Sequence, residues 1–110
     1  MRVFKFGGAS VKDAEGVRNV IEVLKKVGHK DTLIIVSAMG KTTNALELVV
    51  DHYFNQPEEL SNAILELKQF HLQIVEALFG PLSEPMNTRV GELVSELKSF
   101  FKHNKSTNYS

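Results

Sequence analysis

The chain has 110 residues, of which 43% are hydrophobic, and its 13 basic residues balance 13 acidic ones. This length supports at most one domain, because a chain of this size buries only about two thirds of its unfolded surface. The neutral charge predicts neither nucleic acid nor a membrane as partner. The sequence contains no cysteine, which excludes disulfides and zinc–thiolate sites. With no signal-peptide pattern and no apolar run near the roughly 20 residues that span a bilayer, a cytoplasmic location is expected.

The first forty residues predict a βαβ unit. Short apolar runs over 2–6 and 32–37 are typical of strands, and the second is apolar on both faces, as in a buried parallel sheet. Between them, apolar residues recur at helical spacing from Ser10 onward. Ser10 and Asp13 have the spacing of a capping box, and Gly28 ends the pattern. Such a crossover between parallel strands is expected to be right-handed.

The rest of the sequence is predicted to be helical. Three amphipathic stretches cover 46–53, 60–78 and 83–101, and residues 102–110 read as a polar tail or loop. The fold class is therefore α/β, with one βαβ unit followed by three helices. A two-stranded parallel sheet leaves two unpaired edges, so residues 1–110 are expected to be a truncated part of a larger domain and to self-associate.

Residues 5–8, Lys-Phe-Gly-Gly, stand at the end of the first predicted strand. They place a cation and two amides without side chains directly before a helix. Backbone N–H groups can approach an anion closely at such glycines, and the helix adds its partial positive charge. The motif predicts phosphate binding. The alternative is a surface lysine beside a turn whose glycines only relieve strain, since short motifs often match by chance.

A second motif, Ser-Ala-Met-Gly-Lys-Thr-Thr-Asn over 37–44, follows the second predicted strand. The carboxyl ends of parallel strands lie at the same edge of a sheet, so both motifs are expected to face one crevice. Gly40 and Lys41 suggest a P-loop, but Ile35 stands where that pattern requires a glycine. Lys41 is therefore interpreted as a solvated loop residue.

Together the two motifs closely resemble the start of aspartate kinases, members of the amino acid kinase family. That family opens with Lys-Phe-Gly-Gly-Thr-Ser-Val and carries a later Val-Ser-Ala segment ending in Thr-Asn. The resemblance covers about the first half of the chain, and Ala9 stands where the family usually has threonine. It implies a three-layer α/β/α domain, of which residues 1–110 would be the amino-terminal segment.

The resemblance also implies the reaction, which is ATP-dependent phosphorylation of the β-carboxylate of L-aspartate at the start of lysine, threonine and methionine biosynthesis. Aspartate and ATP would be the small-molecule partners, with Mg²⁺ arriving on ATP, and the 110-residue chain alone is expected to be inactive. Lys5 corresponds to the catalytic lysine that contacts the transferred phosphoryl group. The implied nucleotide-binding residues are Lys5, Phe6, Gly7 and Gly8, and the implied substrate-binding residues are Ser37 and Thr43. Ser37 and Thr43 can also serve as turn or helix-start residues.

Two alternatives stay open at this point. A bifunctional aspartate kinase fused to homoserine dehydrogenase has the same opening. A non-catalytic helical binding or regulatory module could keep the βαβ start as a scaffold, and Ala9 is compatible with that reading.

Gly91 and Glu92 resemble a substrate-binding pair of the family but lie in an amphipathic stretch, so Glu92 is predicted to face solvent. The four histidines lack ligand spacing, and no metal site is predicted.

Overall fold

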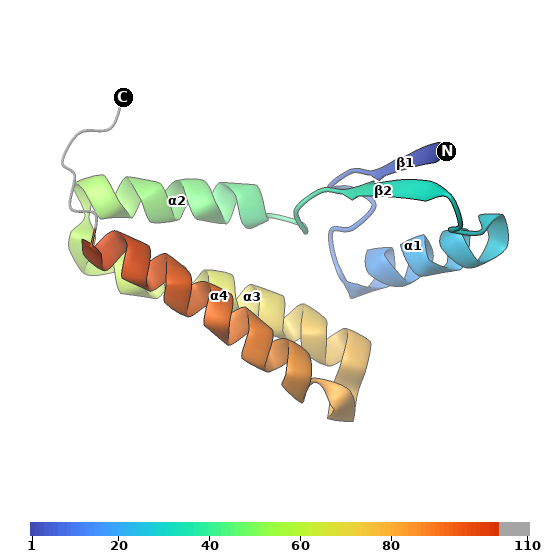
Figure 1. Cartoon of the computed structure of the whole chain (residues 1–110). Coiled ribbons are helices and arrows are strands. Elements are labelled where there is room, and N and C mark those ends of the chain that lie inside the picture. The colour runs from blue at the N-terminus through green and yellow to red at the C-terminus, as the bar shows by residue number, and fades with distance from the viewer. Residues whose placement is uncertain (104–110) are drawn as a thin grey trace. The chain divides into compact units, whose positions relative to one another are not determined.

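The computed structural model describes residues 1–103, and Figure 1 shows the course of the chain. The elements are β1 (Arg2–Phe6), α1 (Ala14–Val27), β2 (Thr32–Val36), α2 (Thr42–Asn55), the 3₁₀ turn η1 (Pro57–Glu59), α3 (Leu60–Phe79), the 3₁₀ turn η2 (Gly80–Leu82) and α4 (Glu84–His103). The chain divides into two compact units, residues 1–43 and the part from Asn44 onward. Each unit is described by itself.

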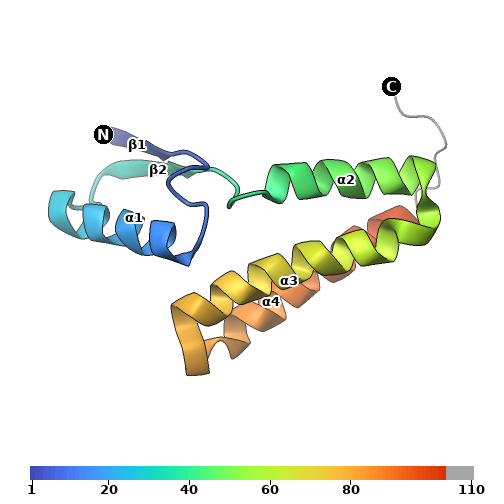
Figure 2. The ribbon, with the colours of Figure 1, turned by 180° about the vertical axis from the view of Figure 1, so that it is seen from behind.

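The first unit is a parallel βαβ unit, as predicted. β1 and β2 pair in parallel, with Arg2 opposite Thr32 and Phe6 opposite Val36. α1 connects the two strands and lies along one face of the small sheet in both views (Figures 1 and 2). The strand bounds agree with the sequence prediction to within one residue.

The two faces of this sheet differ in burial. Phe4 and Ile34 are half-buried, on the face that α1 covers. Val3, Leu33 and Ile35 alternate with them and are 57%, 48% and 45% exposed. Side chains along a strand point to opposite faces in turn, so these three share the second face. The prediction that the second strand is buried on both sides is therefore wrong for the described residues, because only one face has a cover.

α1 begins four residues later than the sequence pattern indicated. The backbone N–H groups of Ser10 and Val11 both donate to the carbonyl of Gly7, which closes a turn ahead of the helix. Val11 is buried in this turn. Asp13 is the actual N-cap, and its side chain accepts a hydrogen bond of 2.9 Å from the N–H of Gly16. The prediction that Ser10 opens the helix as the first residue of a capping box is therefore wrong, since the N-cap is Asp13.

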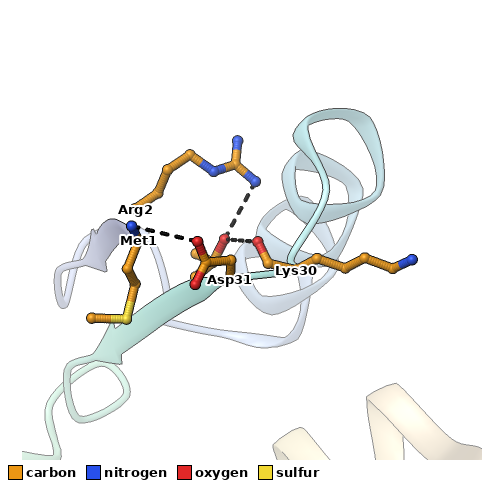
Figure 3. A network of polar contacts seen from close by, with 5 residues as sticks. Met1, Arg2, Lys30 and Asp31 are labelled. Atoms are coloured by element: carbon orange, nitrogen blue, oxygen red, sulfur yellow. Dashed lines mark hydrogen bonds and ion pairs between the residues drawn. The ribbon is translucent and has the colours of Figure 1, made fainter.

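The open end of the βαβ unit is held by polar contacts around Arg2 and Met1 (Figure 3). The Arg2 guanidinium donates to the carbonyl of Val27 at 3.1 Å and to the hydroxyl of Thr32 at 3.3 Å. The amino group of Met1 lies 3.4 Å from the carboxylate of Asp31. These contacts connect the start of β1 to the end of α1 and the start of β2, and so support the register of the sheet.

The second unit is helical and has its own core. Val49 of α2 is fully buried, and it clusters with Ala63 and Ile64 of α3 and Val94 of α4. Partly buried residues around the cluster are Leu60, Val90, Leu97 and Phe101. The three predicted amphipathic helices are confirmed in kind and order.

The predicted polar tail over 102–110 overlaps α4. The helix continues through Lys102 and His103, and the Nδ1 atom of His103 lies 2.8 Å from the carbonyl oxygen of Ser99. Basic residues favour the last turn of a helix because they oppose its partial negative end. Residues 104–110 lie outside the described part of the chain. Within residues 1–103, no helix is both long and apolar enough to cross a bilayer.

We expect Asp13→Ala to weaken α1 by about 1 kcal/mol, the usual effect of losing a side-chain N-cap. Amide hydrogen exchange of residues in the first turns of α1 measures this change directly. Asp13→Asn is the matched control, since it keeps the capping oxygen and should exchange at nearly the wild-type rate. Equal exchange in Asp13→Ala and wild type would contradict the assigned cap.

Candidate functional site

The two sequence motifs meet at the carboxyl end of the sheet in the first unit. Lys5 pairs with Ile35 and Phe6 with Val36, and the N–H of Ser37 then donates to the carbonyl of Phe6 at 3.0 Å. This bond extends the hydrogen-bond ladder between the two strands by one residue past the end of β2. The segments that follow both strands therefore leave the sheet side by side, as the sequence predicted.

Lys5 and Phe6 point to opposite faces of the sheet because they are adjacent on a strand. Lys5 is exposed and shares its face with Val3, away from α1. Phe6 is half-buried and shares its face with Phe4. Lys5 is thus exposed to solvent, whereas the ring of Phe6 lies on the α1 side of the sheet.

The backbone conformation does not require glycine at positions 7 and 8. Within residues 1–103 the glycines with positive φ are Gly28, Gly40 and Gly80. A Cβ atom added to Gly7 would have no neighbour within 4 Å, and one added to Gly8 would meet Ser37 Oγ and the Ala38 carbonyl at an ordinary 3.8 Å. The backbone geometry therefore does not support the alternative prediction, in which these glycines only relieve backbone strain. Both glycines are half-buried, and Gly8 lies next to Ser37.

The second motif forms a tight turn that leads into α2. Gly40 has φ of 51°, a conformation that favours glycine, so this residue is required by the backbone. The N–H and hydroxyl of Thr42 both donate to the carbonyl of Met39. Thr42 is buried, whereas Thr43 is exposed in the first turn of the helix.

The two threonines therefore have different environments. Thr42 braces the loop, and Thr43 keeps its side chain accessible at the same end of the unit as Ser37, which is also exposed. The sequence singled out Thr43 and passed over Thr42. The sequence feature that could have identified Thr42 is its position three residues after Met39. At this spacing a threonine hydroxyl can donate a hydrogen bond to a carbonyl of the turn.

Other candidates from the sequence lie elsewhere or lack the geometry of a site. Lys41 is exposed in the turn, as predicted. Glu92 lies inside α4, half-exposed, with its carboxylate 3.0 Å from the guanidinium of Arg89. In the part of the chain that the structure describes, no three histidine or acidic side chains gather as a metal site would require.

A cavity of about 420 Å³ opens beside the first motif, on the α1 side. Its walls include Phe6, Ala9, Ser10 and the α1 residues Asn19 and Val20. Lys5, Gly7 and Gly8 are not among its lining residues, so the cavity and the glycine pair are separate features. The candidate site is consequently an open strand end rather than an enclosed pocket.

Comparison with known protein families identifies the family of this chain. The model of the amino acid kinase family matches residues 1–98. The chain belongs to the amino acid kinase family. The parallel βαβ unit, whose glycine-rich turn and second loop lie at one end of the sheet, is consistent with the start of a domain of this family.

Aspartokinases are among the curated relatives that the chain matches. The chain is 35% identical over 79 residues to aspartokinase 1, chloroplastic, of Arabidopsis thaliana, an alignment covering 69% of this chain and 14% of that protein. It is 31% identical over 109 residues to the aspartokinase of Corynebacterium glutamicum, covering 86% and 24%. It is 51% identical over 47 residues to the aspartokinase of Mycolicibacterium smegmatis, covering 40% and 11%. The chain thus spans less than a quarter of the length of these relatives.

We expect Gly7→Ala to leave the free energy of unfolding of the first unit unchanged or to raise it by up to about 1 kcal/mol, because alanine restricts the unfolded chain. Gly28→Ala is the contrasting variant, since Gly28 has φ of 81° and ψ of 163°. Alanine is strained there, so a loss of about 1–3 kcal/mol is expected. Urea titration followed by circular dichroism compares the two. A Gly7→Ala loss as large as that of Gly28→Ala would show that Gly7 serves the backbone.

Proposed function

We propose that the chain is the amino-terminal segment of an aspartate kinase domain. The complete protein would transfer the γ-phosphoryl group of ATP to the β-carboxylate of L-aspartate, forming 4-phospho-L-aspartate and ADP. The relatives named aspartokinase support the assignment. The observation that carries it is the hydrogen bond from the Ser37 N–H to the Phe6 carbonyl, because it joins the proposed phosphate-binding and amino acid-binding segments at one strand end.

The chemistry requires positive charge where two anions meet. A β-carboxylate oxygen attacks the γ-phosphorus while the bond from that phosphorus to the ADP oxygen breaks, and no proton needs to move. Charge on the equatorial oxygens must be balanced by cations and N–H dipoles that are already in place. Lys5 is exposed at this strand end and supplies a cation. The uncrowded backbone at Gly7 and Gly8 lets phosphate oxygens approach their N–H groups.

The second loop would hold the amino acid. Ser37 and Thr43 offer exposed hydroxyl groups, and hydroxyls can bind a carboxylate or an ammonium without adding charge that competes with the phosphate. Thr42 keeps the loop in place through its bonds to Met39. Mg²⁺ would be carried by the ATP phosphates, which suits a cation that usually keeps few protein ligands in kinases.

Location and assembly belong to the same proposal. A cytoplasmic location is the expectation from the sequence, although two relatives from Arabidopsis thaliana are named chloroplastic. Self-association is expected from the unpaired edges of the two-stranded sheet.

In the complete polypeptide, Lys5→Ala is expected to lower kcat by about 10²–10³-fold, the range found when one preorganised donor to a developing anion is removed. The free energy of unfolding should stay nearly unchanged because the side chain is exposed. Steady-state assays of ADP release with saturating aspartate measure the effect. Lys26→Ala, an exposed lysine in the last turn of α1, is the matched control and should keep its activity. A near-normal kcat in Lys5→Ala would contradict the assignment of Lys5 as the catalytic lysine of an aspartate kinase.

The 110-residue chain alone is expected to have no kinase activity and to bind ATP weakly or not at all. Its proposed site is an open strand end, with one exposed lysine and two exposed hydroxyls identified in it. Isothermal calorimetry with Mg·ATP tests this. Micromolar affinity would mean that the segment holds a complete nucleotide site, contrary to the proposal.

A further inference from the structure

Gly16, the third residue of α1, has no room for a side chain. A Cβ atom built on it would overlap the carbonyl oxygen of Ser10 and lie 3.2 Å from the carbonyl carbon. It would also lie 3.4 Å from a carboxylate oxygen of Asp13. The Ser10 carbonyl group therefore lies directly against Gly16. All three residues belong to the first unit, so this contact is made within that unit.

The backbone conformation of Gly16 gives no other reason for a glycine at this position. Gly16 lies within α1, and it is not among the glycines of residues 1–103 that have a positive φ. Glycine weakens the interior of a helix relative to alanine, because it loses more conformational freedom on folding. The close approach of the Ser10 carbonyl is thus the structural feature that accounts for Gly16.

The Ser10 carbonyl belongs to the turn that connects β1 to α1 (Figure 1). Within this turn, the N–H groups of Ser10 and Val11 donate to the Gly7 carbonyl at 3.0 Å and 3.3 Å. The turn is therefore held at two places. Hydrogen bonds connect it to Gly7 on the side of the sheet, and the contact with Gly16 places it on the first turn of the helix.

Two planar peptide groups connect Gly16 to the backbone of the glycine pair. The Ser10 carbonyl and the Val11 N–H belong to one peptide group, and the Gly7 carbonyl and the Gly8 N–H belong to another. The hydrogen bond from Val11 to Gly7 joins the two groups, so the orientation of the first restricts the orientation of the second. Because both peptide groups are trans, the Gly8 N–H points away from the turn.

We propose that Gly16 is a positioning residue, which sets the direction of the Gly8 N–H. This inference rests on the proposed function, in which that N–H donates to a phosphate oxygen of ATP. A side chain at position 16 displaces the Ser10 carbonyl, rotates the peptide group that it shares with Val11, and weakens the hydrogen bond to Gly7. The Gly8 N–H then loses its direction. A donor stabilises developing charge only when it already points at that charge, so phosphoryl transfer becomes slower.

The residues proposed to bind aspartate are held by other contacts. The N–H of Ser37 donates to the Phe6 carbonyl, and Thr42 braces the loop that precedes Thr43. These bonds do not involve the peptide groups that connect Gly16 to the glycine pair. A side chain at position 16 should therefore lower kcat and leave the KM for aspartate nearly unchanged.

Steady-state kinetics of Gly16→Ala in the complete polypeptide test this separation. We expect kcat per folded molecule to fall by about 10–10²-fold, whereas the KM for aspartate changes by less than about twofold. Leu24→Ala is the matched control. Leu24 is half-buried and lies about two turns further along α1, so its truncation weakens the packing of the helix at a distance from the turn. Leu24→Ala should keep kcat within about twofold, and an equal fall in both variants would overturn the positioning role.

Amide hydrogen exchange in the 110-residue chain tests the geometry without relying on activity. In Gly16→Ala, the N–H groups of Ser10 and Val11 should exchange at least about tenfold faster than in wild type, because their bonds to Gly7 weaken. The N–H of Ser37 is the internal reference, since it donates to a strand carbonyl, and its rate should change by less than about twofold. Wild-type rates for Ser10 and Val11 in this variant would overturn the inference.

The wild-type chain provides a measurement that does not depend on whether Gly16→Ala folds. The N–H groups of Ser10 and Val11 should exchange at least about tenfold more slowly than in an unstructured peptide of the same sequence. Equal rates would show that the turn is not formed, and this too would overturn the inference.

The proposed function and the inference fail in different ways. A near-normal kcat in Lys5→Ala contradicts the proposed function, whatever Gly16→Ala does to hydrogen exchange in the turn. If Lys5→Ala is inactive while Gly16→Ala keeps the wild-type kcat, the proposed function stands and the positioning role of Gly16 is wrong. The combination that supports both is an inactive Lys5→Ala together with a Gly16→Ala that has a faster-exchanging turn, a lower kcat and an unchanged KM for aspartate.

Discussion

The parallel pairing of β1 with β2 is the constraint on which the rest of the first unit depends. Pairing in the observed register places Phe6 opposite Val36, and the next ladder bond then joins Ser37 to Phe6. A shift by one residue would turn Lys5 to the α1 side and move Phe6 into solvent, because side chains alternate along a strand. Arg2 and Met1 support this register from the opposite end of the sheet through contacts to Val27, Thr32 and Asp31. The arrangement of the candidate site is thus a consequence of how two five-residue strands align.

The glycines of this unit illustrate two different physical roles. Gly28 and Gly40 have positive φ, so they allow the chain to end a helix and to make a tight turn. Gly7 and Gly8 have neither a positive φ nor a crowded neighbour, and the fold alone does not account for them. Glycine costs conformational entropy on folding, so a pair that the backbone does not need favours a use outside the fold. Close approach of an anion to backbone N–H groups is such a use, and it agrees with membership of the amino acid kinase family.

The two units differ in how fully their apolar residues are buried. The helical unit has a fully buried valine and a cluster drawn from three helices. The βαβ unit instead leaves Val3, Leu33 and Ile35 about half exposed and both sheet edges unpaired. An exposed apolar face on a parallel sheet agrees with the proposal that the chain is a segment of a larger domain, since the alignment covers 24% of the Corynebacterium glutamicum relative. The same face carries Lys5, because Lys5 pairs with Ile35 in the observed register.

The sequence by itself determined the elements and their order, because hydrophobic period and glycine positions report local structure directly. It predicted the strands to within a residue, the parallel pairing, and the meeting of residues 5–8 with 37–44 at one sheet end. Only the tertiary structure decided that α1 starts at Ala14, since a turn closed by the Gly7 carbonyl competes with the first helical turn. It also separated the inward Thr42 from the outward Thr43 and left the second face of β2 open. Those outcomes depend on which groups lie across a turn or above a sheet, and a linear pattern does not contain that information.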